Sequence, residues 1–153
     1  VEIGGSYSPS ELQAAFLCAQ LENFESNILE RKSIFFGYFD TFKKHSLDKI
    51  SFIHFEKDYS ANFHAFWVLF ASHLECDFIR QELIKRKINA YTHYVPLHSS
   101  RVGFSMGYKK EDLRITEDYS KRILRLPLHN NMTSDDSIII AELIIKLLKK
   151  YRK

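Results

Sequence analysis

Apolar residues in the first third of the chain recur at intervals of three, four and seven positions. They are Leu17, Leu21, Phe24, Ile28, Phe35, Phe39 and Phe42. This spacing places the side chains on one face of an α-helix. Upstream, Ser8 is suited to cap the helix, Pro9 to occupy its first position and Glu11 to complete a capping box. We therefore predict one long helix over residues 9–44 and place any bend at Gly37.

The middle of the chain alternates between strand-like and helix-like segments. Residues 62–70 and 88–94 are rich in aromatic and branched side chains and have the length of strands, as has 123–128, which Pro127 and the following asparagines stop. Residues 50–55 are compatible with a further short strand. Leu74, Phe78, Ile79 and Leu83 have helical spacing. The pattern predicts a helix over 74–87 between two of the strands.

The last third begins with a segment that has no clear period. Residues 99–114 contain two glycines and are predicted to be a surface loop. Thr116 is expected to cap a short helix. Thr133 and Asp136, three positions apart, are expected to cap the final helix. The apolar face of that helix is Ile140, Leu143, Ile144, Leu147 and Leu148.

The expected order is long helix, strand, helix, strand, loop, helix, strand, helix. Helices set against a small sheet of about three strands define an α+β domain, because the strands are too few for a doubly wound fold. We divide the chain into a loop and long linking helix over residues 1–45 and an α+β small domain over residues 46–153.

Composition supports a folded domain and argues against several functions. The 153 residues are 45% apolar and 14% aromatic, enough to form a real core. The net charge of +3 is small and most basic residues stand beside acids. The terminal cluster of Lys149, Lys150, Arg152 and Lys153 complements the dipole of a helix end. We therefore expect no nucleic acid as a partner.

Cysteine and hydropathy patterns add further exclusions. Cys18 and Cys76 are far apart and are not at metal-ligand spacing, so we expect neither a metal site nor a disulfide, and two small core residues in a reducing cytoplasm. The longest apolar run, 138–145, is too short to cross a bilayer, and no membrane partner is expected. No signal peptide opens the chain. The start at Val1, without a Met, suggests a fragment.

Four segments together resemble the DegT/DnrJ/StrS family of sugar-nucleotide aminotransferases. They are residues 4–32, NFHAFWVLF at 62–70, THYVPLH at 92–98 and 116–136, and they follow the order found in the family. Within the family, the chain is most similar to transaminases that convert a thymidine-diphosphate-linked 4-keto-6-deoxyhexose into a 4-amino-4,6-dideoxygalactose.

The resemblance implies the C-terminal small domain of a fold-type-I enzyme that uses pyridoxal 5′-phosphate. Such an enzyme is a homodimer that transfers the amino group of glutamate to a nucleotide-linked keto-sugar, here in surface polysaccharide synthesis (O-antigen or common antigen). The lysine motif that binds the cofactor covalently is absent from this sequence. We therefore expect the catalytic large domain upstream of Val1, no catalytic residue in this chain, and no activity of the fragment alone.

The resemblance also implies contacts to the cofactor. Ser8 matches a family position that contacts the cofactor phosphate of the partner subunit, and a helix N-terminus is suited to that task. Tyr7 precedes it and is expected to line the same cleft. The alternatives are that Ser8 only caps its own helix and that Tyr7 only packs.

A second set is expected to bind the substrate. The resemblance places His93, Tyr94 and His98 near the sugar nucleotide, on a strand end and the following turn, and a structural role is the alternative for each histidine. Arg101, in the predicted loop, is suited to the diphosphate because a guanidinium binds phosphate oxygens in a bidentate manner. We expect His64 to pack in the core and His129 to form part of a turn.

Two other functions stay open. One is a free-standing, non-catalytic binding or interaction domain. The other is a member of the same family that lacks the lysine and acts as a dehydratase or a regulator. Since the deciding position lies outside this sequence, its residues do not separate these from a transaminase.

Overall fold

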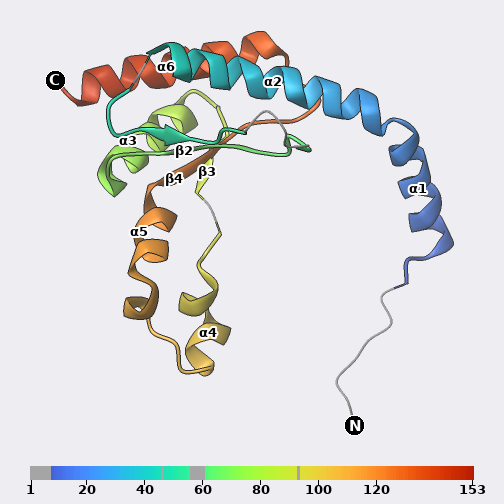
Figure 1. Cartoon of the computed structure of the whole chain (residues 1–153), viewed down its shortest axis with the longest axis horizontal. Coiled ribbons are helices and arrows are strands. Elements are labelled where there is room, and N and C mark those ends of the chain that lie inside the picture. The colour runs from blue at the N-terminus through green and yellow to red at the C-terminus, as the bar shows by residue number, and fades with distance from the viewer. Residues whose placement is uncertain (1–7, 46, 56–60, 93) are drawn as a thin grey trace.

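The computed structural model describes residues 8–45, 47–55, 61–92 and 94–153. Its centre is an antiparallel four-stranded sheet in the order β1-β2-β4-β3 (Figure 1). The strands are β1 (Ser51–Phe52), β2 (Phe66–Leu69), β3 (Tyr91–Thr92) and β4 (Ile123–Leu126). The α+β class predicted from the sequence is confirmed, and the segment at 50–55 contributes the fourth strand.

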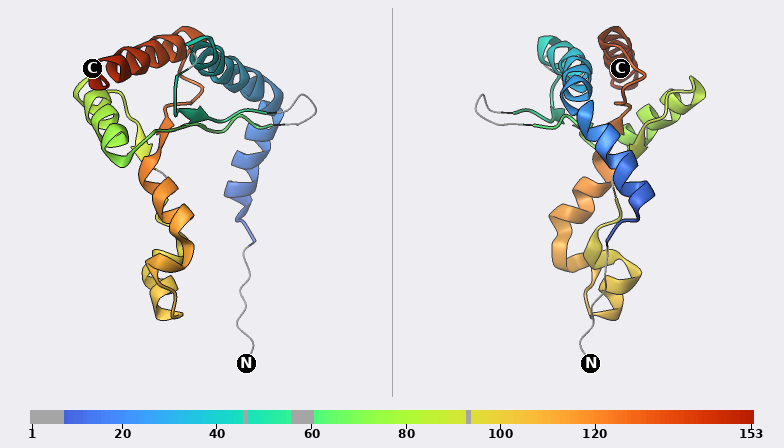
Figure 2. Two further views of the ribbon diagram at one scale, coloured as in Figure 1. Left: turned by 60° about the vertical axis from the view of Figure 1, so that its left-hand side comes forward. Right: turned by 90° about the vertical axis from the view of Figure 1, so that its right-hand side faces the viewer.

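Two long helices cover one face of this sheet. Helix α2 (Phe24–His45) and helix α6 (Ser134–Tyr151) lie side by side above it, and helix α3 (His73–Lys85) packs beside them (Figures 1 and 2). Their buried side chains meet Phe66, Val68, Leu124 and Leu126 of the strands. Burying each such large side chain contributes roughly 1.5–3 kcal/mol. These side chains form one hydrophobic core, which accounts for the apolar stripes of the helices and strands.

Aromatic rings fill the end of the core nearest the middle of α2. The ring of Phe35 lies 5.0–5.6 Å from those of Phe36, Phe55, Phe63 and Phe66, centroid to centroid. Such pairs contribute beyond the area they bury. Tyr38, also buried, donates its hydroxyl to the carbonyl oxygen of Pro127 at 2.9 Å. The C-terminal half of α2 therefore belongs to the same core as residues after 46, and the domain boundary at residue 45 stays a prediction.

The start of the first helix differs from the prediction. Helix α1 spans Glu11–Glu22 and its N-cap is Ser10, not Ser8. The Oγ atom of Ser10 accepts from the backbone N–H of Gln13, whose side chain accepts in return from the N–H of Ser10. The capping box is therefore formed by Ser10 and Gln13, two residues further along the chain than the predicted pair Ser8 and Glu11.

The predicted single long helix is also wrong in one place. The helix is interrupted at Asn23, between α1 and α2. There the side-chain amide of Asn23 donates a hydrogen bond to the carbonyl oxygen of Ala19 at 3.0 Å. A short amide side chain competes for backbone groups in this way and favours helix ends. Helix α2 runs through Gly37. There a Cβ would overlap Ser137 of α6, so close helix packing, not a bend, explains the glycine.

Helix α1 stands apart from the body of the molecule (Figure 1). It has no buried residue although its sequence is apolar around its circumference. Leu12, Phe16, Leu17 and Leu21 are all more than half exposed. A helix that is hydrophobic all round is normally buried. None of the described residues covers α1.

The predicted loop at 99–114 is instead largely helical. The 3₁₀ turns η1 (Leu97–Ser99) and η2 (Lys110–Leu113) and the helices α4 (Arg101–Ser105) and α5 (Arg114–Arg122) form a helical arm, residues 97–122, that projects away from the face covered by α2 and α6 (Figures 1 and 2). Gly103 packs so closely that a Cβ would overlap the carbonyl oxygens of Leu97 and His98. Thr116 lies inside α5 and does not cap it.

The remaining helices follow the sequence closely. The side chain of Thr133 caps α6 together with Asp136, as predicted, and α3 occupies the predicted segment. Cys76 is buried but Cys18 lies exposed on α1, so only one of the two cysteines is a core residue here. No helix in the described part of the chain is long and apolar enough to cross a membrane.

Candidate functional site

The face of the sheet opposite α2 and α6 carries polar and aromatic side chains. In β4 the residues alternate, with Leu124 and Leu126 buried in the core and Arg125 half-buried on the other side. Arg125 pairs in register with Trp67 of β2 and with Tyr91 of β3. On the sheet, Arg125 therefore stands between two aromatic residues, in the middle of a cross-strand row.

A cleft of about 540 Å³ opens at the end of this row. Arg125, Tyr91, Tyr94, His64 and His129 line it, together with residues of neighbouring segments, and none of the described carboxylates does so. The guanidinium carbon of Arg125 is 5.8 Å from the ring centroid of Tyr94, within the range of a cation–π contact. Arg125 makes no ion pair with any residue in the described ranges. We call this the Arg125 cleft.

The two histidines of the cleft depart in part from expectation. His64 is exposed and not in the core, because β2 begins two residues later, at Phe66. Its Nδ1 is 2.8 Å from the amide oxygen of Asn62, which orients the ring with Nδ1–H as donor and leaves Nε2 for a ligand. His129 does begin a turn, as predicted, in which its carbonyl oxygen accepts from the N–H of Met132 at 3.0 Å.

The predicted substrate-binding residues are separated by the structure. Tyr94 is 76% exposed at the rim of the Arg125 cleft. Arg101 is exposed on α4, in the helical arm. His93, like Tyr7 of the predicted cofactor set, lies outside the described residues. Of the substrate residues predicted from the sequence, the cleft thus includes Tyr94.

His98 is buried inside the arm instead of facing open space. Only 6% of the residue is exposed, and its Nε2 lies 3.4 Å from Oε1 of Glu117 in α5. Neither atom has a hydrogen-bond partner among the described residues. His98, which belongs to η1, therefore packs against α5. This position agrees with a structural role, the alternative to substrate binding for this residue.

A second, more apolar hollow of about 530 Å³ lies beside the arm. Tyr94, Val95 and Leu97 form one wall, and Ile115 and Tyr119 of α5 form the other. All five side chains are close to half exposed or more. Exposed apolar patches of this kind mark contacts with another molecule or another part of the protein.

Ser8 precedes α1, and that helix lies away from the arm (Figure 1). Because Ser10 provides the cap, the hydroxyl of Ser8 makes no hydrogen bond to the described residues, and the first N–H groups of α1 point toward the same end. A phosphate group fits such a helix start. The rest of a cofactor site does not fit here, since every lysine in the described part of the chain is exposed and a lysine bound covalently to a cofactor is desolvated.

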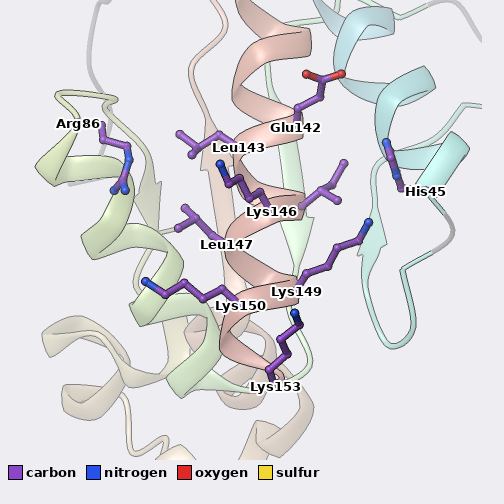
Figure 3. Close-up of a pocket in the computed structure, with 10 residues that line it drawn as sticks. His45, Arg86, Glu142, Leu143, Lys146, Leu147, Lys149, Lys150 and Lys153 are labelled. Atoms are coloured by element: carbon purple, nitrogen blue, oxygen red, sulfur yellow. The ribbon is translucent and has the colours of Figure 1, made fainter.

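A further hollow, of about 810 Å³, lies on the basic surface over the end of α6 (Figure 3). Lys146, Lys149 and Lys150 project from α6 and Lys153 follows it, with Arg86 at the end of α3 and His45 at the end of α2 nearby. Three helices end in this region, and basic residues in a last turn complement the dipole of their helix. The lysines are fully accessible and no buried polar group accompanies them, so this surface is explained without a ligand.

The described ranges show no candidate metal site. They contain no group of three or more His, Cys, Asp or Glu side chains placed to hold a metal ion. The Arg125 cleft and the start of α1 are thus the two places in the described chain that we consider as candidate binding sites for polar ligands.

Comparison with known proteins identifies the family. Residues 2–144 match the DegT/DnrJ/EryC1/StrS aminotransferase family, and the chain belongs to it. The proposed pyridoxal phosphate-dependent aminotransferase EpsN of Bacillus subtilis is 29% identical over 151 residues, which are 95% of this chain and 38% of EpsN.

Solved structures show the same fold. PseC of Helicobacter pylori, an aminotransferase of pseudaminic acid biosynthesis, superposes with a TM-score of 0.81 at 22% identity, over 98% of this chain and 40% of PseC. A proposed sugar aminotransferase of Streptococcus pneumoniae, in its PLP form, also gives 0.81 at 22% identity, over 92% of this chain and 36% of that one. The chain spans about two-fifths of the length of its relatives.

Sequence reasoning missed Arg125 and misplaced His64. The alternation of Leu124, Arg125 and Leu126 was a usable signal, because a charged residue between two core residues of a strand must face the other side of the sheet. No local sequence pattern indicates the strand register that places Arg125 opposite Tyr91.

Proposed function

We propose that this chain is the C-terminal small domain, with its linking helix, of a pyridoxal-phosphate-dependent aminotransferase that acts on a nucleotide-linked 4-keto-6-deoxy sugar. Glutamate is the amino donor, and the product serves surface polysaccharide synthesis (O-antigen or common antigen) in the cytoplasm. The catalytic lysine lies upstream of Val1. The chain alone is inactive.

One observation carries this proposal beyond the family assignment. Helix α1 is apolar all round and buries nothing in this chain. An isolated helix of 12 residues is marginal in water, so tertiary packing must stabilise it. A second body of protein that covers α1 accounts for this, and the same body accounts for the exposed apolar walls beside the helical arm.

The arrangement also supports a homodimer. Ser8 precedes α1 in the chain, whereas Tyr94 precedes the helical arm, and α1 and the arm lie well apart in Figure 1 and in the left view of Figure 2. A cofactor phosphate held at Ser8 and a substrate held near Tyr94 thus belong to two different active sites. Ser8 would serve the site of the partner subunit.

When bound, the cofactor supplies the electron sink for amino-group transfer. Within this chain, Ser8 and the first N–H groups of α1 would hold its phosphate. Tyr7, which precedes Ser8, would line the same site. Tyr94 and Arg101 would contact the sugar nucleotide, with His93 beside Tyr94 in sequence. His98 would support the arm from within.

The proposal is tested with protein that includes the residues upstream of Val1. Incubated with pyridoxal phosphate, glutamate and a thymidine-diphosphate-linked 4-keto-6-deoxyhexose, it should yield the 4-amino sugar nucleotide by mass spectrometry, while the chain of residues 1–153 yields none. Formation of a dehydrated sugar instead would point to a lysine-less member of the family. A coding sequence that starts immediately before Val1 would support a free-standing binding domain.

A further inference from the structure

From the Arg125 cleft we infer a phosphate-binding subsite in which Arg125 holds the diphosphate of the nucleotide-linked sugar. The inference rests on the proposed function for the identity of the ligand. The geometry of the cleft stands independently of it. Arg125 was not among the residues that the sequence assigned to substrate.

Charge is the first argument. Arg125, His64 and His129 contribute basic groups to the cleft, and no acidic side chain among the described residues lines it. Most arginines elsewhere in the described chain have acceptors: Arg152 bonds to Glu75, Arg122 to Asp118, Arg86 to Glu82 and Arg80 to Asp77. Arg125 is half-buried and forms no ion pair with any described residue. A guanidinium that is partly desolvated and unpaired binds an anion strongly when one arrives.

Position is the second argument. The cross-strand neighbours Trp67 and Tyr91 flank Arg125 on the sheet, and the Tyr94 ring lies 5.8 Å from the guanidinium carbon. The contact with the Tyr94 ring orients the guanidinium at the cleft, which both residues line, before a ligand binds. The planar fork of an arginine suits the paired oxygens of a phosphate, which it can contact in a bidentate manner.

The shape of the cleft defines the rest of the ligand. A volume of about 540 Å³ exceeds what an isolated phosphate fills and lies in the range of small-molecule sites. Tyr91 is 66% exposed at its edge and offers a ring face for a sugar or a base. An anionic group joined to ring systems, such as a nucleoside diphosphate, matches both features.

The test titrates the isotope-labelled chain with inorganic pyrophosphate, thymidine 5′-diphosphate, thymidine and glutamate, and follows backbone amide shifts. Pyrophosphate and thymidine diphosphate should shift the amides of β4 and of residues near Tyr91. Arg125→Gln should weaken their binding roughly tenfold to a hundredfold, as expected for the loss of a charge-assisted hydrogen bond. Arg125→Lys, which keeps the charge but not the fork, should lie in between.

Arg114→Gln is the matched control. It removes the same charge from an exposed position on α5, outside the cleft, and should bind both phosphates as the unmodified chain does. Circular dichroism shows whether each variant is folded. The inference is overturned by equal affinities of Arg125→Gln and the unmodified chain, by equal loss in Arg114→Gln, by binding of thymidine as tight as that of its diphosphate, or by no binding at all.

Titration with glutamate distinguishes the two anions that Arg125 could hold, a phosphate and the carboxylate of the amino donor. If glutamate, and not pyrophosphate, depends on Arg125, the residue holds the carboxylate of the amino donor and the phosphate assignment is wrong. The outcome for the proposed function is distinct. A longer protein that transaminates the sugar with unchanged KM in Arg125→Gln contradicts the subsite alone, whereas Arg125-dependent pyrophosphate binding without transamination contradicts the function alone.

Discussion

Arg152, immediately after the last helix, donates from Nε to Oε1 of Glu75 at 2.6 Å, and Glu75 is only 2% exposed. The second carboxylate oxygen accepts from the backbone N–H of Ala71 at 3.0 Å. Arg152 also donates to the carbonyl oxygen of Asp48 at 2.9 Å. One arginine thus ties the end of α6 to the start of α3 and to the turn before β1.

Arg152→Ala should destabilise the chain by about 3 kcal/mol, since it leaves the carboxylate of Glu75 buried without its cation. Equilibrium unfolding in urea measures the loss. Arg152→Ala combined with Glu75→Gln should lose less than the sum of the two single variants, because the double variant has no unpaired charge. Strict additivity would contradict a direct coupling between these residues.

Gly37→Ala should destabilise the chain by roughly 1–3 kcal/mol through overpacking. The new Cβ would overlap Oγ of Ser137 and lie 2.8 Å from the carbonyl oxygen of Ser134, so α2 and α6 would have to separate. Ser33→Ala, at an exposed position on the same helix, is the control and should change the free energy of unfolding little. A neutral or stabilising Gly37→Ala would show that helix propensity, and not packing, governs this position.

The two cysteines should differ sharply in reactivity. Burial raises the pKa of the Cys76 thiol to about 12, so almost no thiolate is present at pH 8. Cys18 is exposed on α1. Iodoacetamide followed by mass spectrometry should show alkylation of Cys18 within minutes and of Cys76 only in denaturant. Protection of Cys18 in the same experiment would indicate that self-association through α1 covers it.

Stability should fall in the alkaline range. Burial raises the pKa of the Tyr38 hydroxyl, with Asp136 adding to the effect, and the pKa of Cys76 is raised too. A group whose folded pKa is raised stabilises the fold fully below its unfolded pKa, and that contribution is lost as the pH rises toward the folded value. The unfolded values are about 8.5 for Cys and about 10 for Tyr. The free energy of unfolding should therefore decrease above about pH 9, and less steeply in Tyr38→Phe.

The features that the sequence predicted correctly have their causes in neighbouring residues. Thr133 and Asp136, three positions apart, cap α6, and the apolar stripe of that helix faces the core because helical geometry places it there. The α+β class follows from the same periodicities. Family motifs add what periodicity cannot supply, namely the identity of the fold that these elements form.

The features that it missed depend on distant contacts. The helices of the arm are short, and Gly103 stabilises them by close packing on the carbonyl groups of Leu97 and His98. His98 is buried because it meets Glu117, from another helix. The role of Arg125 depends on strand register. None of these relationships leaves a period in the sequence.

We propose that this chain is part of a pyridoxal-phosphate aminotransferase whose covalent lysine lies upstream of Val1. Borohydride reduction in the presence of pyridoxal phosphate, followed by peptide mapping, tests it most directly. The account predicts no stoichiometric labelling of any lysine in residues 1–153, and a single labelled lysine upstream of Val1 in the longer protein. Stoichiometric labelling of one lysine within this chain would contradict it.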